Sequence, residues 1–466
     1  MTTITITRSE AHLSARSFDS AVNQFVPDGI MKLTTQLALL LTLVITSTFA
    51  DDTIPGAPQT QPIALVGGTI HTVSGDTIQN GTLLFDDGKI VAAEANVAVP
   101  EGAKRIDVSG KHVYPGLFES HSQLGLTEIA STRATVDHRE GGALNPNLQA
   151  NRAVNPDSTL IPVTRSNGVL LALSAPTGGI VSGRASVMYM DGWTFEDMTL
   201  KGAAVLQVNW PRMEPVFRAE GDESPEEQDE ERESALQQLR KLFSDTRVYK
   251  KARAAGKQKF DIRLDSMIPV IDGKIPLLIG ADMLDQIQSA VMFAVEQKVQ
   301  AIILGGYDAP LCAELLKKHK VPVIVSAVHR RPRRRSDDYD APYTLPLRLS
   351  KAGVQYCISG TDRSESMNAR NLPYEAGYAV AYGLPKDEAL KSITLYPAQI
   401  LGVADRVGSL EAGKDATIFV CTGDTLETDS NVTHAWIRGR KVDLNDHQKR
   451  LFQKYSEKYK QLKAKK

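Results

Sequence analysis

The chain has 466 residues, of which 42% are apolar and 23% are charged, and these ordinary values exclude a disordered, collagen-like or multi-span membrane chain. Its 54 basic and 55 acidic residues give a net charge of −1, so the basic surplus typical of a nucleic-acid-binding protein is absent. Three cysteines are too few for a disulfide framework, and the core must therefore be held together by burial.

The first fifty residues resemble a targeting region. An apolar run from Leu33 to Ala50 follows Met31-Lys32 and closes on Thr-Phe-Ala, which is typical of a secretory signal. We predict that Met31 is the true initiator and that residues 1–30 are a mis-called start. The mature chain then begins near Asp51 and is exported to the periplasm or the extracellular space. The alternative is an uncleaved membrane anchor, although the run is short for a bilayer span of about 20 residues.

Residues 51–112 predict a small antiparallel sheet. Short strands between Ile63 and Val108 alternate apolar and polar residues, and Asp87-Gly88 is a hairpin signal because glycine takes the positive φ that such turns need. The same pattern returns in residues 404–442. We therefore predict one composite β-sandwich built from both ends of the chain.

Residues 113–403 predict an α/β fold. Short runs rich in Val, Ile and Leu suit strands buried on both faces, and apolar stripes at helical spacing follow several of them, for example in residues 283–297. Strand–helix–strand repeats indicate right-handed parallel βαβ units, and enough occur for a closed TIM-like (β/α)8 barrel. Residues 212–275 leave the strand count open.

Two charged segments complete the chain. Residues 212–262 carry an acidic block, then apolar residues at helical spacing, then basic residues. This pattern predicts a solvated helical insertion on a barrel loop in preference to a partner-binding arm. Residues 443–466 predict a basic amphipathic helix, whose lysines and arginines we expect to form a solvated face in preference to a membrane patch.

Three motifs resemble the amidohydrolase superfamily and occur in its order along residues 63–442. They are LVGGTIHTVSG with the NGTLLFDDGKIVAA hairpin, VYPGLFESHSQLG, and ITLYPAQILGVADRVGSLEAGKDATIFV. Within the superfamily the chain is most similar to imidazolonepropionase-related hydrolases of carbon–nitrogen bonds. The resemblance implies a distorted TIM barrel with a composite sandwich and an active site at the C-terminal ends of the barrel strands. It also implies hydrolysis of an amide or amidine bond by metal-activated water.

The chain departs from the metal-ligand pattern of this superfamily. The first-strand motif carries two histidines there, and this chain keeps His121 but has Gln123, whose neutral amide is a poor zinc ligand. The ends of strands five and six hold no histidine, and their nearest acids are Asp282 and Asp308. These departures indicate a divergent member that holds no metal, in preference to one that holds a single divalent metal, zinc before others, on His121 and Asp362. A full binuclear centre is the least favoured arrangement.

The other candidate residues lie at the expected mouth of the barrel. Asp362, just past strand eight, has the place of the family's ligand and general base, and His329 after strand seven is a second catalytic candidate. Arg184, in a glycine-rich loop over residues 174–193, is a candidate substrate clamp together with Gln123. Asp362 can instead cap a turn, and the basic residues after His329 can be plain surface neutralised by the aspartates that follow.

Two functions remain in competition. The favoured one is an exported hydrolase of carbon–nitrogen bonds other than peptide bonds, acting on a small molecule such as a cyclic amide. The other is a binding protein on the same fold that has lost catalysis and holds no metal. We expect no nucleic-acid partner and no membrane span after signal cleavage, and a homodimer is left open because members of this superfamily often pair.

Overall fold

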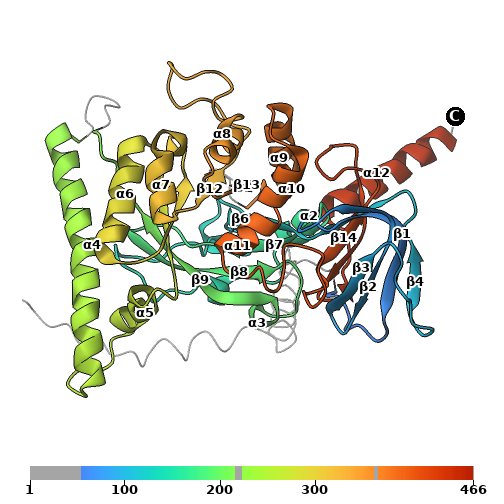
Figure 1. Ribbon diagram of the computed structural model, residues 1–466, viewed down its shortest axis with the longest axis horizontal. Helices are drawn as coiled ribbons and strands as arrows, with labels where there is room; N and C mark the ends of the chain where they lie inside the picture. The colour runs from blue at the N-terminus through green and yellow to red at the C-terminus, as the bar shows by residue number, and fades with distance from the viewer. Residues whose placement is uncertain (1–53, 216–222, 361–365, 465–466) are drawn as a thin grey trace, which may run out of the picture. The chain divides into compact units, whose positions relative to one another are not determined.

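A computed structural model describes residues 54–215, 223–360 and 366–464 (Figure 1). The predicted targeting region and Asp362 lie outside these ranges. Residues Asp51–Lys466 form one compact unit. None of the described helices is both long enough and apolar enough to cross a membrane.

Within these ranges an eight-stranded sheet forms the predicted barrel. In order along the sheet its strands are β6 (Leu117–Ser122), β7 (Val169–Ser174), β8 (Val181–Tyr189), β9 (Thr199–Asn209), β10 (Leu277–Ala281), β11 (Ala301–Gly305), β12 (Val323–Ser326) and β13 (Tyr356–Ser359). The strands from β9 to β13 are parallel neighbours. Most of their residues are buried, as their continuous apolar runs predicted.

The parallel pattern is interrupted at β8, which runs antiparallel to both β7 and β9. The prediction of a loop over residues 174–193 is therefore wrong. Gly178 and Gly179 take positive φ angles of 85° and 64°, which turn the chain back after β7 so that β8 can follow. Both faces of β8 are buried, and burial on both faces is satisfied by either strand direction.

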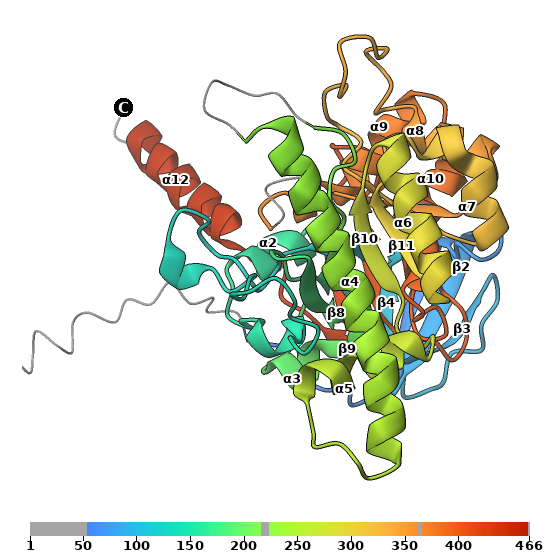
Figure 2. The same ribbon diagram turned by 90° about the vertical axis from the view of Figure 1, so that its left-hand side faces the viewer.

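Helices accompany the barrel strands. They are α2 (Leu160–Arg165), α3 (Phe195–Met198), α4 (Pro225–Ala254), α5 (Ile262–Ile271), α6 (Leu284–Gln297), α7 (Ala313–His319), α8 (Leu345–Lys351), α9 (Leu372–Ala381), α10 (Lys386–Ser392) and α11 (Leu395–Ile400). The long α4 lies beside α6 (Figure 2). Its acidic first turns are largely exposed, but Leu239 and Phe243 are buried, and Phe243 meets Phe293 of α6 edge-on with ring centroids 5.5 Å apart. The prediction of a solvated insertion is wrong for the part of α4 that follows its acidic turns, because the apolar stripe of that part packs on the barrel.

A second sheet joins strands from both ends of the described chain, as we predicted for the composite domain. Its strands are β1 (Ile63–His71), β2 (Thr77–Asp86), β3 (Lys89–Glu94), β4 (Lys104–Asp107), β5 (His112–Pro115), β14 (Ile418–Cys421), β15 (Val432–Ile437) and β16 (Arg440–Lys441). The two ends meet where β14 pairs antiparallel with β5. The prediction of an antiparallel sheet over residues 51–112 is wrong in part, because β1 pairs parallel with both β4 and β5. This sheet buries a core of its own, in which Phe85 and Trp436 meet edge-on. The last helix, α12 (His447–Ala464), follows it.

Candidate active site

A buried carboxyl group joins the first and last strands of the barrel. Glu119 of β6 is fully buried and accepts three hydrogen bonds. The donors are the Ser359 hydroxyl at 2.5 Å, the Gly360 amide at 2.8 Å and the His121 amide at 3.2 Å. Ser359 and Gly360 stand at the end of β13, so Glu119 fixes that strand end against β6.

The protonation of Glu119 is tied to the orientation of Ser359. Burial raises the pKa of the Glu119 carboxyl to about 7, because the loss of water disfavours the charged form more than the three donors favour it. The Ser359 hydroxyl also lies 3.1 Å from the carbonyl oxygen of His121. A hydroxyl has one proton, so Ser359 can donate to only one of these two oxygens. When Glu119 is charged, Ser359 donates to the carboxylate. When Glu119 is protonated, the carboxyl donates to the Ser359 oxygen and Ser359 donates to the His121 carbonyl. The two events are therefore coupled near neutral pH.

His121, the predicted metal ligand, is half-buried near the end of the same strand. It follows Glu119 by two residues, so the two side chains share one face of β6. Burial lowers the pKa of the His121 imidazole to about 4, which leaves the ring neutral at pH 7. A neutral imidazole is the form that coordinates a metal, accepts a proton or polarises a carbonyl.

Gln123 occupies the position of the superfamily's second histidine and is also buried. Its amide oxygen accepts a hydrogen bond from the Thr127 hydroxyl at 3.2 Å, and this hydroxyl lies 2.8 Å from Nδ1 of His138. Thr127 thus joins Gln123 to a histidine of the following loop. These contacts hold the Gln123 amide in place, and its substrate-binding role stays a prediction.

The other predicted site residues have different surroundings. Arg184 lies on β8, and its guanidinium donates to the Asn147 carbonyl at 3.2 Å. His329 is exposed, and its ring stacks on Tyr378 of α9 with 4.3 Å between centroids and 4° between planes. The roles of both residues stay predictions, as does that of Asp362, which lies outside the described residues.

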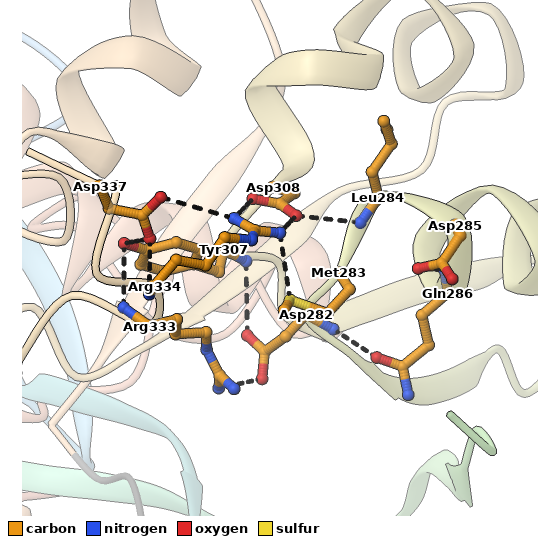
Figure 3. Close-up of polar contacts among 10 residues, drawn as sticks. All are labelled: Asp282, Met283, Leu284, Asp285, Gln286, Tyr307, Asp308, Arg333, Arg334 and Asp337. Atoms are coloured by element: carbon orange, nitrogen blue, oxygen red, sulfur yellow. Dashed lines mark hydrogen bonds and ion pairs between the residues drawn. The ribbon is translucent and has the colours of Figure 1, made fainter. Parts of the chain in front are cut away.

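Two ion pairs bridge strand ends at the mouth of the barrel (Figure 3). Asp282 follows β10 and pairs with Arg333, and Asp308 accepts hydrogen bonds from both terminal nitrogens of Arg334. Both arginines come from the segment after β12. The prediction that this basic segment is neutralised by the aspartates that follow it is wrong for Arg333, because its partner comes from another strand. It is incomplete for Arg334, which also lies 3.7 Å from Asp337.

The two ion pairs bear on the question of a metal. They stand after strands five and six of the barrel, where the superfamily places histidine ligands. The carboxylates of Asp282 and Asp308 are already paired with the guanidinium groups of Arg333 and Arg334. Within residues 54–215, 223–360 and 366–464, no three His, Cys, Asp or Glu side chains gather closely enough to hold a metal ion. The described donors therefore do not fit a binuclear centre. A single zinc on His121 and Asp362 stays a prediction.

A cavity of about 840 Å³ lies beside these ion pairs. Its walls come from the ends of β10, β11 and β12 and from the segment after β9, which together mark the C-terminal end of the barrel. Both this position and this size are typical of small-molecule sites in such barrels. The charged side chains that line it are Arg212, Glu214, Asp282, Asp285, Arg330, Arg331 and Arg333. The predicted site residues of the described ranges, which are His121, Gln123, Arg184 and His329, are not among its lining residues.

Sequence reasoning missed Glu119 and the partners of the arginines. A signal for Glu119 existed, because a charged residue inside an apolar strand requires buried partners. The partners themselves, Ser359 and Gly360, lie 240 residues away or more and leave no local signal.

Comparison with known proteins agrees with this fold. Residues 282–442 match the model of the amidohydrolase family. An amidohydrolase from Thermotoga maritima MSB8 has a crystal structure that is similar with a TM-score of 0.72 and 25% identity, covering 82% of this chain and 99% of that one. Together with the barrel and the composite sheet, these matches support the amidohydrolase superfamily for this chain.

Two curated proteins add detail. The imidazolonepropionase of Mesorhizobium japonicum is 23% identical over 382 residues, covering 74% of this chain and 86% of that protein. The amidohydrolase tasK of Hapsidospora irregularis is 40% identical over 73 residues, and this match spans only 7% of its length. The similarity to the first relative extends over about three quarters of this chain, whereas the second is local.

The raised pKa of Glu119 predicts a dependence of stability on pH. The unfolded carboxyl has a pKa of 4.5 and the folded one about 7, so protonation favours the folded chain. The contribution of Glu119 is complete below pH 4.5 and is lost as the pH rises through about 7. The loss amounts to roughly 3 kcal/mol. We expect Glu119→Gln, which stays neutral, to lack this loss when urea unfolding is followed over this range.

The control for this experiment is Glu196→Gln, which neutralises an exposed carboxyl at the start of α3. We expect its unfolding free energy to follow that of the wild type at every pH. A difference between Glu119→Gln and wild type that is constant from pH 4.5 to 8 contradicts the raised pKa.

Proposed function

We propose that this chain is an exported hydrolase of carbon–nitrogen bonds other than peptide bonds, and that its substrate is a small molecule with an amide or cyclic amide group. One observation carries the proposal. A cavity of small-molecule size lies at the C-terminal strand ends of a barrel whose later part falls within residues 282–442, the region that matches the amidohydrolase family. The similarity to an imidazolonepropionase supports a cyclic amide as the substrate class.

In this proposal Asp362 is the general base. It takes a proton from water, the water oxygen adds to the carbonyl carbon, the carbon–nitrogen bond breaks, and the proton passes to the leaving nitrogen. The hydrogen bond from the Gly360 amide to Glu119 supports this assignment, because it fixes the chain two residues before Asp362. Glu119 is fully buried and acts as a positioning residue.

The remaining predicted residues act on the substrate. The neutral His121 imidazole polarises the carbonyl, since its low pKa keeps the ring uncharged at pH 7. Gln123 and Arg184 bind polar groups of the substrate, and His329 is a second acid–base group at the rim. The fixed Gln123 amide supports its part in this scheme, because a group held by Thr127 loses little freedom when it binds.

The role of Asp362 is tested by Asp362→Asn. We expect kcat for hydrolysis of imidazolonepropionate, or of another small cyclic amide that the wild type cleaves, to fall by at least about 100-fold, because the amide cannot take a proton from water. The matched control is Asp338→Asn, an exposed aspartate of the segment after β12, which we expect to keep full activity. Full activity of Asp362→Asn contradicts the proposed role.

One observation favours a second function, a binding protein that neither catalyses nor holds a metal. The strand ends where the superfamily places ligand histidines carry the pairs Asp282–Arg333 and Asp308–Arg334. A barrel whose mouth carries these ion pairs can still bind a small molecule in the adjoining cavity. Fold alone does not decide between the two functions.

Metal content separates the two functions. We expect elemental analysis of the chain, produced with zinc in the growth medium, to find no more than one equivalent per chain, because the ends of β10 and β11 are occupied by ion pairs. If one equivalent is found, His121→Ala removes it and His319→Ala, at the end of α7, does not. Two equivalents contradict our assignment, and no zinc together with no turnover of cyclic amides favours the binding protein.

Export is tested on the N-terminus of the recovered chain. The apolar run before Asp51 supports cleavage there, and we expect sequencing of the chain from the periplasm or medium to begin at Asp51. Leu41→Arg, which places a charge inside the run, should retain the uncleaved precursor in the cell. Recovery of the wild type from the cytoplasm with its first residues intact contradicts export.

A further inference from the structure

Helix α12 (His447–Ala464) carries an apolar stripe that no other described element covers. The helix has no buried residue, and its large apolar side chains are exposed by 37% at Leu451 to 76% at Phe452. The stripe consists of Leu451, Phe452, Tyr455, Tyr459 and Leu462. At about 100° per residue these positions fall within one arc of roughly 100°. Both views show the end of this helix projecting away from the two sheets (Figures 1 and 2).

Basic side chains lie along both edges of the stripe. By the same helical geometry Lys454 and Lys458 border one edge and Lys463 borders the other. Lys449, nearer the start of the helix, donates to the Leu444 carbonyl at 2.7 Å. The ammonium groups of Lys454 and Lys458 lie 6.0 and 5.8 Å from the centre of the Tyr455 ring. The helix holds six Lys or Arg residues and one Glu, whereas the whole chain has a net charge of −1. Positive charge is therefore concentrated in α12, and the remainder of the chain is acidic.

We propose that α12 lies on the surface of an anionic lipid bilayer. Its apolar stripe then enters the boundary of the acyl chains, and its lysines contact the headgroup phosphates. An apolar arc of this width with lysines on both edges is the pattern of interfacial helices. The family match ends at residue 442, so the helix lies beyond the matched region. The proposal does not depend on catalysis.

A second copy of the chain fits the stripe less well. Two paired α12 helices bring like charges together, and the stripe from Leu451 to Leu462 covers fewer than two heptads, where stable coiled coils need about three or four. The acidic start of α4 complements the charge of α12. Its residues 225–234, however, offer no large apolar side chain to cover the stripe.

The test uses the chain from Asp51 onward, which forms the compact unit described above. It is sedimented with vesicles of phosphatidylcholine alone, or of two parts phosphatidylcholine to one part phosphatidylglycerol. We expect at least about tenfold tighter binding to the anionic vesicles, and a loss of this preference at high salt. The triple variant F452S/Y455S/Y459S should lose at least about tenfold in binding to them.

The matched control is Tyr339→Ser, because Tyr339 is a similarly exposed aromatic residue, at 74%, outside α12. It should bind as the wild type does, and circular dichroism should show all three proteins folded, since every substituted side chain is exposed. Equal binding by the triple variant and the wild type overturns the proposal, as does equal binding to both kinds of vesicle. A dimer that the triple variant dissociates, with no vesicle binding, overturns it too and assigns the stripe to a second copy.

Discussion

The barrel depends on a seam that side chains close. Parallel ladders join β9 to β13, but among the described residues no ladder pairs β13 with β6. There the Ser120 hydroxyl donates to the Ile358 carbonyl at 3.3 Å, and Glu119 accepts from Ser359 and Gly360. Loss of the Glu119 carboxyl leaves buried donors without this acceptor, and each such donor costs about 1–3 kcal/mol.

A second buried carboxyl stands beside the first. Glu375 of α9 accepts hydrogen bonds from the Val328 amide at 2.5 Å and the His329 amide at 2.7 Å, so it fixes the chain after β12 as Glu119 fixes the end of β13. Burial raises the pKa of Glu375, and its charge in turn raises the pKa of Glu119. Two neighbouring strand ends at the mouth are thus positioned by buried carboxyls, and charge on Glu375 disfavours charge on Glu119. This arrangement links the geometry of the site to pH.

Local sequence patterns predicted the barrel, the composite sheet and the terminal helix, because burial and turn chemistry act over a few residues. The direction of β8 was not predictable, since an apolar run suits a buried strand in either orientation. The partners of Glu119 and Arg333 were missed for another reason: they come from distant strand ends that only the closed barrel brings together. His121 and Gln123 could be placed at the mouth from one motif, but their hydrogen-bond partners depend on the loop that follows.

The central claim is that Glu119 closes the seam and changes its protonation near neutral pH. The amide of Gly360 reports this directly, because it donates to Glu119 at 2.8 Å. In the chain labelled with ¹⁵N-glycine, we expect its NMR shift to titrate with a midpoint at about pH 7, and this titration to vanish in Glu119→Gln. A Gly360 amide that shows no titration between pH 4.5 and 8 in the wild type contradicts the claim.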